Sequence, residues 1–254
     1  MYVEKFYDFC AKLMDEIRRD EMAAIEKASD MIADAVEASR QFYIYDRGHL
    51  IGGELLGRAG GATFVRRLEM PLPDPTLLNK NTGSRSAARL AGKELTAKKR
   101  AFEKTYIEYS LDLNGIGEGD VLLLNSNSGF GFSAVAVAEA AKRRGVKLIV
   151  MSSKETSEAI TPEGGEKKLA EFADILFDNH SPYGDAVFDV EGLDEKFWPA
   201  SGMGAVFIAW PLVIMTVEKL LARGVKPTVF RSVNIPGGPE QLERAAKRYE
   251  ELGY

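Results

Sequence analysis

The sequence predicts an α/β fold, a three-layer sandwich in which helices cover both faces of a doubly wound parallel sheet. Two observations support this prediction. Short runs of strand-forming apolar residues recur along the chain, and several of them lead through a polar or glycine-containing turn into a helical pattern. Strands that are apolar on both faces are typical of a parallel sheet buried between helix layers. The predicted strands are 42–45, 121–124, 147–151 and 174–177, with a fifth within 62–68.

Helical patterns flank this core at both ends. Phe6, Phe9, Leu13 and Ile17 recur at helical spacing, and a second helix follows before residue 40. We expect a buried helix from Gly202 to Arg223, interrupted by Pro211, and a last amphipathic helix over 236–254. The segment 71–88 is rich in proline and polar residues and is interpreted as a lid. The prediction is a single domain, 1–254, with N-terminal helices over 1–40, an α/β core over 41–200 and C-terminal helices over 201–254.

Composition excludes several classes of protein. The chain has 254 residues, 33 basic and 38 acidic, with a net charge of -5. It offers no basic stripe, so we expect neither nucleic acid nor a membrane as partner. Its one cysteine, Cys10, lies among apolar residues and indicates packing in a reducing compartment. Acidic residues near the N-terminus interrupt the apolar stretch that a signal peptide would need. The apolar run 205–217 is too short to span a bilayer, so the predicted location is the cytoplasm.

Ligands of open parallel sheets bind at the carboxyl ends of the strands. That rule selects four turns: Asp46–His49, Ser126–Gly131, Ser152–Ser153 and Asn179–Asp185. The second turn joins an apolar strand to the start of a helix. Hydroxyls and backbone N–H groups at such a position bind anions, so the expected ligand is a phosphate. The alternative is that these residues are simply good turn and cap formers. The spacing of a nucleoside-triphosphate loop is absent, and Ala134 replaces the third glycine of a dinucleotide fingerprint.

Two of these segments carry a family resemblance. The turn Ser126-Asn127-Ser128-Gly129 resembles the phosphosugar-binding turn of SIS (sugar isomerase) domains, and the segment Glu54–Arg58 resembles the Glu-Leu-x-Gly-Arg helix of phosphoheptose isomerases. Further similarity, over roughly 24–238, is to uncharacterised phosphosugar-binding proteins of the SIS family. The resemblance implies a five-stranded parallel sheet in flavodoxin-like order and a homodimer or homotetramer with active sites shared between subunits.

The resemblance also implies a catalytic role for Glu54. The matching glutamate of phosphoheptose isomerases moves a proton between adjacent sugar carbons, which requires a carboxylate in a partly dry pocket. The alternative is a solvated glutamate paired with Arg58. His49 and His180, the two histidines of the chain, both follow predicted strands and are candidates for a general acid or an electrophilic catalyst. The alternative for each is a structural hydrogen bond within its turn.

The remaining candidate residues would bind the substrate. They are Arg47, Gly48, Ser126, Asn127, Ser128, Gly129, Ser152, Ser153 and Asp185. Asp185 either holds a sugar hydroxyl or caps its turn. The sequence has no paired ligand spacing for a metal, although some phosphoheptose isomerases use zinc, and we expect neither metal nor cofactor.

Two departures from the family pattern leave the ligand open. Leu50 stands where a serine is usual in the first turn, and Phe130-Gly131 follows the second turn where a polar residue is usual. The ligand is therefore a sugar phosphate, a sugar with another anionic group, or a neutral sugar. The favoured function is an aldose–ketose sugar phosphate isomerase acting through an enediol. The alternatives are a non-catalytic sugar-phosphate sensor and, last, an etherase-type lyase, whose longer turn is absent.

Overall fold

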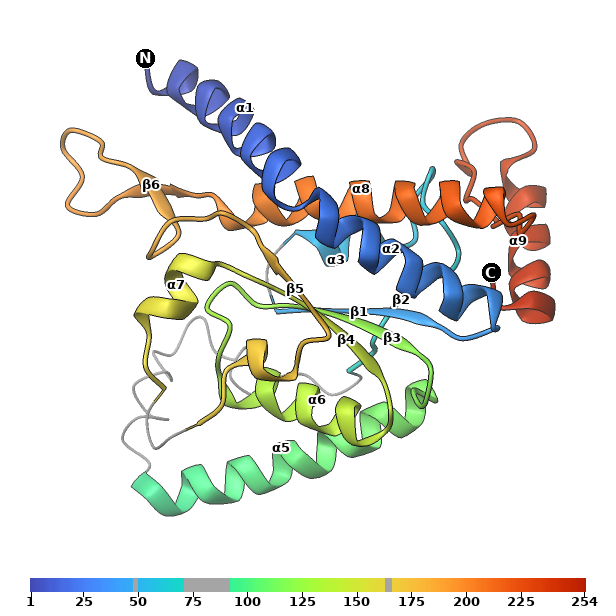
Figure 1. The fold of residues 1–254 in the computed structure, drawn as a ribbon, viewed down its shortest axis with the longest axis horizontal. Coiled ribbons are helices and arrows are strands. Elements are labelled where there is room, and N and C mark those ends of the chain that lie inside the picture. Colours follow the sequence, from blue (N-terminus) through green and yellow to red (C-terminus); the bar gives the residue numbers. More distant parts are fainter. Residues whose placement is uncertain (48–49, 71–91, 163–165) are drawn as a thin grey trace.

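The computed structural model describes residues 1–47, 50–70, 92–162 and 166–254 (Figure 1). The lid interpretation of 71–88 falls outside these residues. In chain order the elements are α1 (Tyr2–Asp20), α2 (Met22–Glu37), β1 (Phe42–Asp46), α3 (Ile51–Glu54), β2 (Val65–Arg67), α5 (Gly92–Asn114), β3 (Val121–Asn125), α6 (Phe132–Arg143), β4 (Lys147–Ser152), α7 (Lys154–Ala159), the 3₁₀ turn η2 (Leu169–Phe172), β5 (Ile175–Asp178), β6 (Ala186–Phe188), β7 (Phe197–Pro199), α8 (Ser201–Ala222) and α9 (Gly238–Leu252).

The main sheet has the predicted order. Its five strands run β2-β1-β3-β4-β5 and every neighbouring pair is parallel. The chain leaves β1 toward one edge of the sheet and returns to build β3, β4 and β5 toward the other edge. The prediction of a five-stranded, flavodoxin-like sheet is therefore confirmed, and the switch in direction lies between β1 and β3, where ligands of such folds bind.

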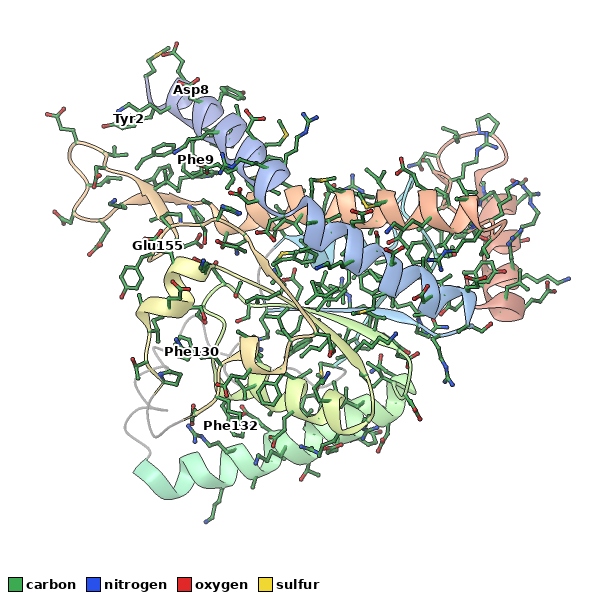
Figure 2. All side chains as sticks on the ribbon, in the orientation of Figure 1. Tyr2, Asp8, Phe9, Phe130, Phe132 and Glu155 are labelled. Carbon is green, nitrogen blue, oxygen red and sulfur yellow. The ribbon has the colours of Figure 1, made fainter. Side chains whose placement is uncertain are left out.

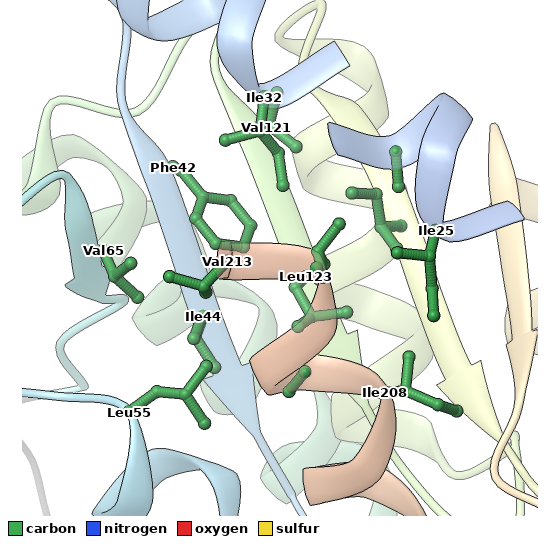
Figure 3. Close-up of a cluster of buried hydrophobic side chains, with 14 of the residues drawn as sticks. Ile25, Ile32, Phe42, Ile44, Leu55, Val65, Val121, Leu123, Ile208 and Val213 are labelled. Carbon is green, nitrogen blue, oxygen red and sulfur yellow. The ribbon is translucent and has the colours of Figure 1, made fainter. Parts of the chain in front are cut away.

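Alternation along the strands divides the apolar residues between two cores. On β3, Val121 and Leu123 belong to a core shared with α2 and α8, whereas Leu122 and Leu124 belong to a core shared with α5 and α6. Figure 3 shows the first core, where Ile25 and Ile32 of α2 meet strand residues from above the sheet. Successive side chains of a strand point to opposite faces, so apolar runs are needed when both faces are covered. The three-layer prediction is confirmed.

Helix α8 runs unbroken across one face of the sheet, so the predicted interruption at Pro211 is wrong. Buried residues lie on both sides of Pro211, from Gly204 to Leu220, and packing against α2 holds the helix together through the proline. The helix is also longer than the apolar run recognised in the sequence. Within the described chain, α8 alone is long and apolar enough to match a membrane span, but its buried side chains form part of the core.

The close approach of α8 to the sheet requires glycine at one position. A Cβ atom at Gly204 would lie 2.0 Å from the carbonyl oxygen of Asn179, which follows β5. No side chain can occupy that space, since this separation is far inside van der Waals contact. Gly204 therefore lets the first turns of α8 pack directly on the backbone after β5.

Other elements differ from the sequence prediction. Helix α3 ends at Glu54 rather than continuing to Arg58, because Gly57 takes a left-handed conformation with φ of 63°. The long helix α5 and the antiparallel pair β6–β7 were not predicted. In Figures 1 and 2, α1 and the β6–β7 hairpin project together from the core, and Phe9 lies between them.

We predict that Gly204→Ala lowers the free energy of unfolding by about 3 kcal/mol or more, because overpacking forces α8 away from Asn179. Gly202→Ala in the same helix is the matched control. Its Cβ would lie 3.5 Å from Leu50, an ordinary contact, so this variant should be neutral or up to about 1 kcal/mol more stable. Urea unfolding followed by circular dichroism measures both; equal stabilities would contradict the packing argument.

Candidate functional site

Four turns meet at the carboxyl edge of the sheet. Asp46 at the end of β1 is in register with Asn125 at the end of β3, and Ser152 of β4 is in register with Asp178 of β5. A cavity of about 490 Å³ opens beside these turns. Its lining consists of Arg47, Ser126, Asn127, Ser128, Phe130, Gly131, Phe132, Ser133, Ala134, Thr156, Gly184 and Asp185. The cavity thus lies where the sequence argument expects a ligand.

The turn after β3 has a fixed shape. The backbone N–H of Ser126 donates to Met151 (3.0 Å), and that of Gly129 donates to the carbonyl of Ser126 (2.9 Å). Gly129 has φ of 65°, and a Cβ there would lie 2.8 Å from Oγ of Ser157. Glycine is required at this position by both conformation and space. Gly129 shapes the turn and does not line the cavity.

Asn127 ties three of the four turns together. Its side-chain oxygen accepts hydrogen bonds from Nδ2 of Asn179 (2.9 Å) and from Oγ of Ser181 (2.8 Å). Its carbonyl oxygen accepts one from the N–H of Ser153 (2.9 Å). The side-chain oxygen of Asn127 is thus engaged within the protein, while the residue still borders the cavity.

The start of α6 forms one wall of the cavity. Gly131 is the N-cap, and Phe132, Ser133 and Ala134 of the first turn all line the cavity. The first N–H groups of a helix have no partner inside the helix and carry the positive end of its dipole. The guanidinium-bearing Arg47 borders the same space. This arrangement suits a phosphate or another compact anion.

Three of the predicted ligands are buried or hydrogen-bonded within the protein. Ser153 is fully buried and is the N-cap of α7, accepting from the N–H of Thr156 (3.1 Å) and donating to the carbonyl of Ser181 (2.7 Å). Ser152 is also buried and, like Ser153, is absent from the cavity lining. Asp185 lines the cavity, but its two carboxylate oxygens accept from the N–H and the hydroxyl of Ser201 (both 2.8 Å), at the start of α8.

His180 points to the junction of α1 and α2. Its Nε2 lies 3.4 Å from Oε1 of Glu21, without hydrogen-bond geometry, and both side chains are largely buried. Its backbone N–H donates to Oδ1 of Asp178 (2.9 Å). Burial raises the pKa of the Glu21 carboxyl, and the nearby His180 opposes that shift. His180 is not among the residues that line the cavity.

Glu54 lies at the end of α3, against α8. Its carboxylate is ion-paired with Arg58 and accepts a hydrogen bond from Nε1 of Trp210 (3.3 Å). The pairing with Arg58 that the sequence left as an alternative is therefore present. Glu54 is about one-third exposed and is absent from the cavity lining. Gly48 and His49, the other candidates of this turn, fall outside the described residues.

The sequence analysis gave no role to four polar residues of this edge, although two of them, Asp46 and Ser181, lie in turns that it selected. Ser133 and Thr156 line the cavity. The sequence analysis found no polar residue at Phe130-Gly131, and Ser133, in the first turn of α6, supplies a hydroxyl close to that position. Asp46 accepts from the N–H of Gly52 (2.7 Å) and from Nδ2 of Asn125 (2.8 Å), which anchors α3 to the sheet. Ser181 supports Asn127. Each of the four lies within a few residues after a predicted strand or at the start of the next helix. That position could have identified it as a candidate from the sequence.

The described residues contain no group of three or more histidine, cysteine, aspartate or glutamate side chains placed to hold a metal ion.

Comparisons with known proteins match this fold. A family model described as the SIS domain matches residues 5–153. A UPF0309 protein of Shouchella clausii is 28% identical over 98% of this chain and 97% of its own, and one of Brucella canis is 30% identical over 97% and 95%. The solved phosphoheptose isomerase of Neisseria gonorrhoeae superposes with a TM-score of 0.50 at 12% identity, covering 87% of this chain and 97% of that one. This structural likeness concerns the fold.

The buried Glu21 predicts a pH effect. Its pKa in the folded chain is raised above the ordinary value of 4.5, so the stability it contributes is present below that value and is lost as pH rises through the folded pKa. Glu21→Gln removes this titration. The unfolding free energy of the wild type minus that of Glu21→Gln should therefore decrease from acidic to neutral pH.

Urea unfolding at a series of pH values measures this difference. Glu4→Gln, which alters an exposed glutamate of α1, is the control and should show no such slope. A difference that increases with pH would show that attraction to His180 outweighs the burial of Glu21.

Proposed function

Because this chain belongs to the SIS domain family, we propose that it binds a phosphorylated sugar in the cavity beside α6 and interconverts its aldose and ketose forms through an enediol. The observation that carries the proposal is the convergence of the α6 N-terminus, the hydroxyl-bearing turn after β3 and Arg47 on one cavity. Metabolites that present a terminal phosphate fit such a site, since the group is compact and anionic.

The phosphate would lie over the first turn of α6. Backbone N–H groups of Phe132 to Ala134 would donate to its oxygens, with the hydroxyls of Ser128 and Ser133 completing the shell and Arg47 supplying opposite charge. In the structure the Ser128 hydroxyl donates to the carbonyl of Phe130 over 3.3 Å. This contact is long enough to be exchanged for a stronger, charge-assisted one.

Glu54 is the proposed base. It would take the proton from the carbon next to the substrate carbonyl and return it to the neighbouring carbon, while Trp210 and Arg58 orient the carboxylate. Glu54 does not border the described cavity, which favours a site completed by a second subunit. Since His180 faces Glu21, His49 is the better candidate of the two histidines for polarising the carbonyl.

A sugar-phosphate sensor without turnover is the second candidate. One observation favours it: the carboxylate of Glu54 is held by Arg58 and is not among the residues that line the cavity. A sensor needs the turn after β3 but has no use for a base.

The whole chain is proposed to act as one cytoplasmic, homo-oligomeric unit of residues 1–254. Supporting this, α2 from the N-terminal part and α8 from the C-terminal part pack against each other and on the same face of the sheet. Neither terminal segment could be removed without uncovering that core.

Ligand binding is predicted to raise thermal stability. A ligand that binds the native state stabilises it by RT ln(1 + [L]/Kd), about 2.7 kcal/mol at ~100 times Kd. A thermal-shift screen of sugar phosphates, free sugars and sugar acids should show shifts with phosphorylated sugars alone, and Ser128→Ala should reduce them. Shifts confined to neutral sugars would overturn the anion site; shifts confined to sugar acids would replace phosphate by carboxylate.

Replacing the base separates the two candidate functions. For an isomerase, Glu54→Gln should keep binding but lower kcat by about 100-fold or more, because general base catalysis contributes this much. Ser128→Ala is the matched comparison and should raise KM more than it lowers kcat. The assay is aldose–ketose conversion of the sugar phosphates that gave thermal shifts. Full turnover by Glu54→Gln would rule out the proposed base, and binding without turnover by the wild type would favour the sensor.

A further inference from the structure

The turn after β5 carries a hydrogen-bond network that fixes the orientation of one amide in the cavity wall. The backbone N–H of Ser181 donates to Oδ1 of Asn179 (3.0 Å). A backbone N–H can only donate, so this contact identifies Oδ1 of Asn179 as the acceptor and Nδ2 as the donor of that side chain. Nδ2 of Asn179 contacts the side chain of Asn127 (2.9 Å). The atom of Asn127 that it meets is therefore the amide oxygen.

The amide of Asn127 is left with its NH2 group available to a ligand. Its oxygen accepts from Asn179 and also from Oγ of Ser181 (2.8 Å), which occupies both lone pairs. Its Nδ2 atom has no hydrogen-bond partner among the residues that the structure describes, and Asn127 lines the cavity. This point of the cavity wall therefore offers a donor, which suits the oxygen of an anion.

His180 lies between the two residues that hold this amide. Its backbone is left-handed, with φ of 55°, a conformation that is costly for residues with a Cβ atom, although asparagine, aspartate and histidine adopt it more readily than others. Its N–H donates to Oδ1 of Asp178 (2.9 Å), and its largely buried imidazole lies against Glu21. Its two neighbours are bonded to each other across it, and both donate to Asn127.

We propose that His180 is a positioning residue for the anion site: its left-handed backbone closes the turn that holds Asn179 and Ser181 against Asn127, and so keeps the NH2 group of Asn127 directed to the ligand. The inference rests on the proposed function for the anionic nature of that ligand. His180 does not line the cavity and acts through its neighbours. A β-branched residue at this φ would be a steric outlier, so it would force the turn into another conformation and release the Asn127 amide.

Substitutions at His180 separate its backbone from its imidazole. His180→Asn, His180→Gly and His180→Val all remove the imidazole, but asparagine and glycine tolerate the left-handed backbone and valine does not. With inorganic phosphate as the probe in titration calorimetry, His180→Val should raise Kd about 10-fold or more, and the other two should stay within about 3-fold of the wild type. Wild-type binding by His180→Val would overturn the proposal. Equally weak binding by all three would also overturn it, because the effect would then belong to the imidazole.

Two further variants test the specificity of the effect. Ser39→Val is the matched control, because Ser39 also has a left-handed backbone (φ of 56°) but is exposed, precedes β1 and does not line the cavity. It should lower the free energy of unfolding and leave the Kd for phosphate unchanged. Asn127→Asp keeps an oxygen for both accepted hydrogen bonds but replaces the NH2 donor by a carboxylate oxygen, so it should abolish phosphate binding. Retained binding by Asn127→Asp would overturn the role of Asn127 as donor.

Ser128→Ala distinguishes failure of this inference from failure of the anion site. Equal phosphate binding by Ser128→Ala and the wild type, or none by either, would count against the proposed anion site. The turn is tested without any ligand by amide hydrogen exchange over 126–131 and at Ser153, whose N–H donates to the carbonyl of Asn127 (2.9 Å). These amides should exchange faster in His180→Val than in His180→Gly, and equal rates would overturn the positioning role of His180.

Discussion

The approach of α8 to the backbone after β5 is the contact on which both the core and the candidate site depend. With no side chain at Gly204, the helix lies directly on Asn179. The same helix covers one face of the sheet together with α2 and begins where Asp185 binds Ser201. Asn179 in turn donates to Asn127 in the turn after β3. The close contact between α8 and Asn179 therefore fixes the position of α8 relative to the edge of the sheet where the ligand is proposed to bind.

The polar residues of this edge divide into those that face the cavity and those that hold its walls. Ser153 and Asn127 resemble ligands in the sequence, yet Ser153 caps α7 and the side-chain oxygen of Asn127 is occupied by Asn179 and Ser181. A buried polar group must find a partner inside the protein. Neighbouring turns supply such partners, whereas the start of α6, with Ser128 and Ser133, lines the cavity in which an anion is proposed to bind.

Two features of one chain bear on the proposed reaction: the cavity at the start of α6 and the carboxylate of Glu54 at the end of α3. Glu54 is held against α8 by Trp210, whereas the cavity is lined by residues of the turns after β1, β3 and β5, by the start of α6 and by Thr156 of α7. An isomerase needs its base next to the carbon that exchanges a proton, so the proposed reaction requires Glu54 to reach a substrate held in the cavity.

The sequence by itself determined the α/β class, the five parallel strands and the edge at which a ligand would bind, because apolar runs, glycine turns and helical spacing are local signals. The strand-to-helix turn around Ser126 was found in the same way. Only the tertiary structure decided that α8 passes through Pro211, that His180 faces Glu21, that Ser153 caps α7 and that Asp185 binds Ser201. These outcomes depend on which distant segments pack together, and a short polar residue after a strand looks the same in sequence whether it turns to a ligand or to a neighbouring turn.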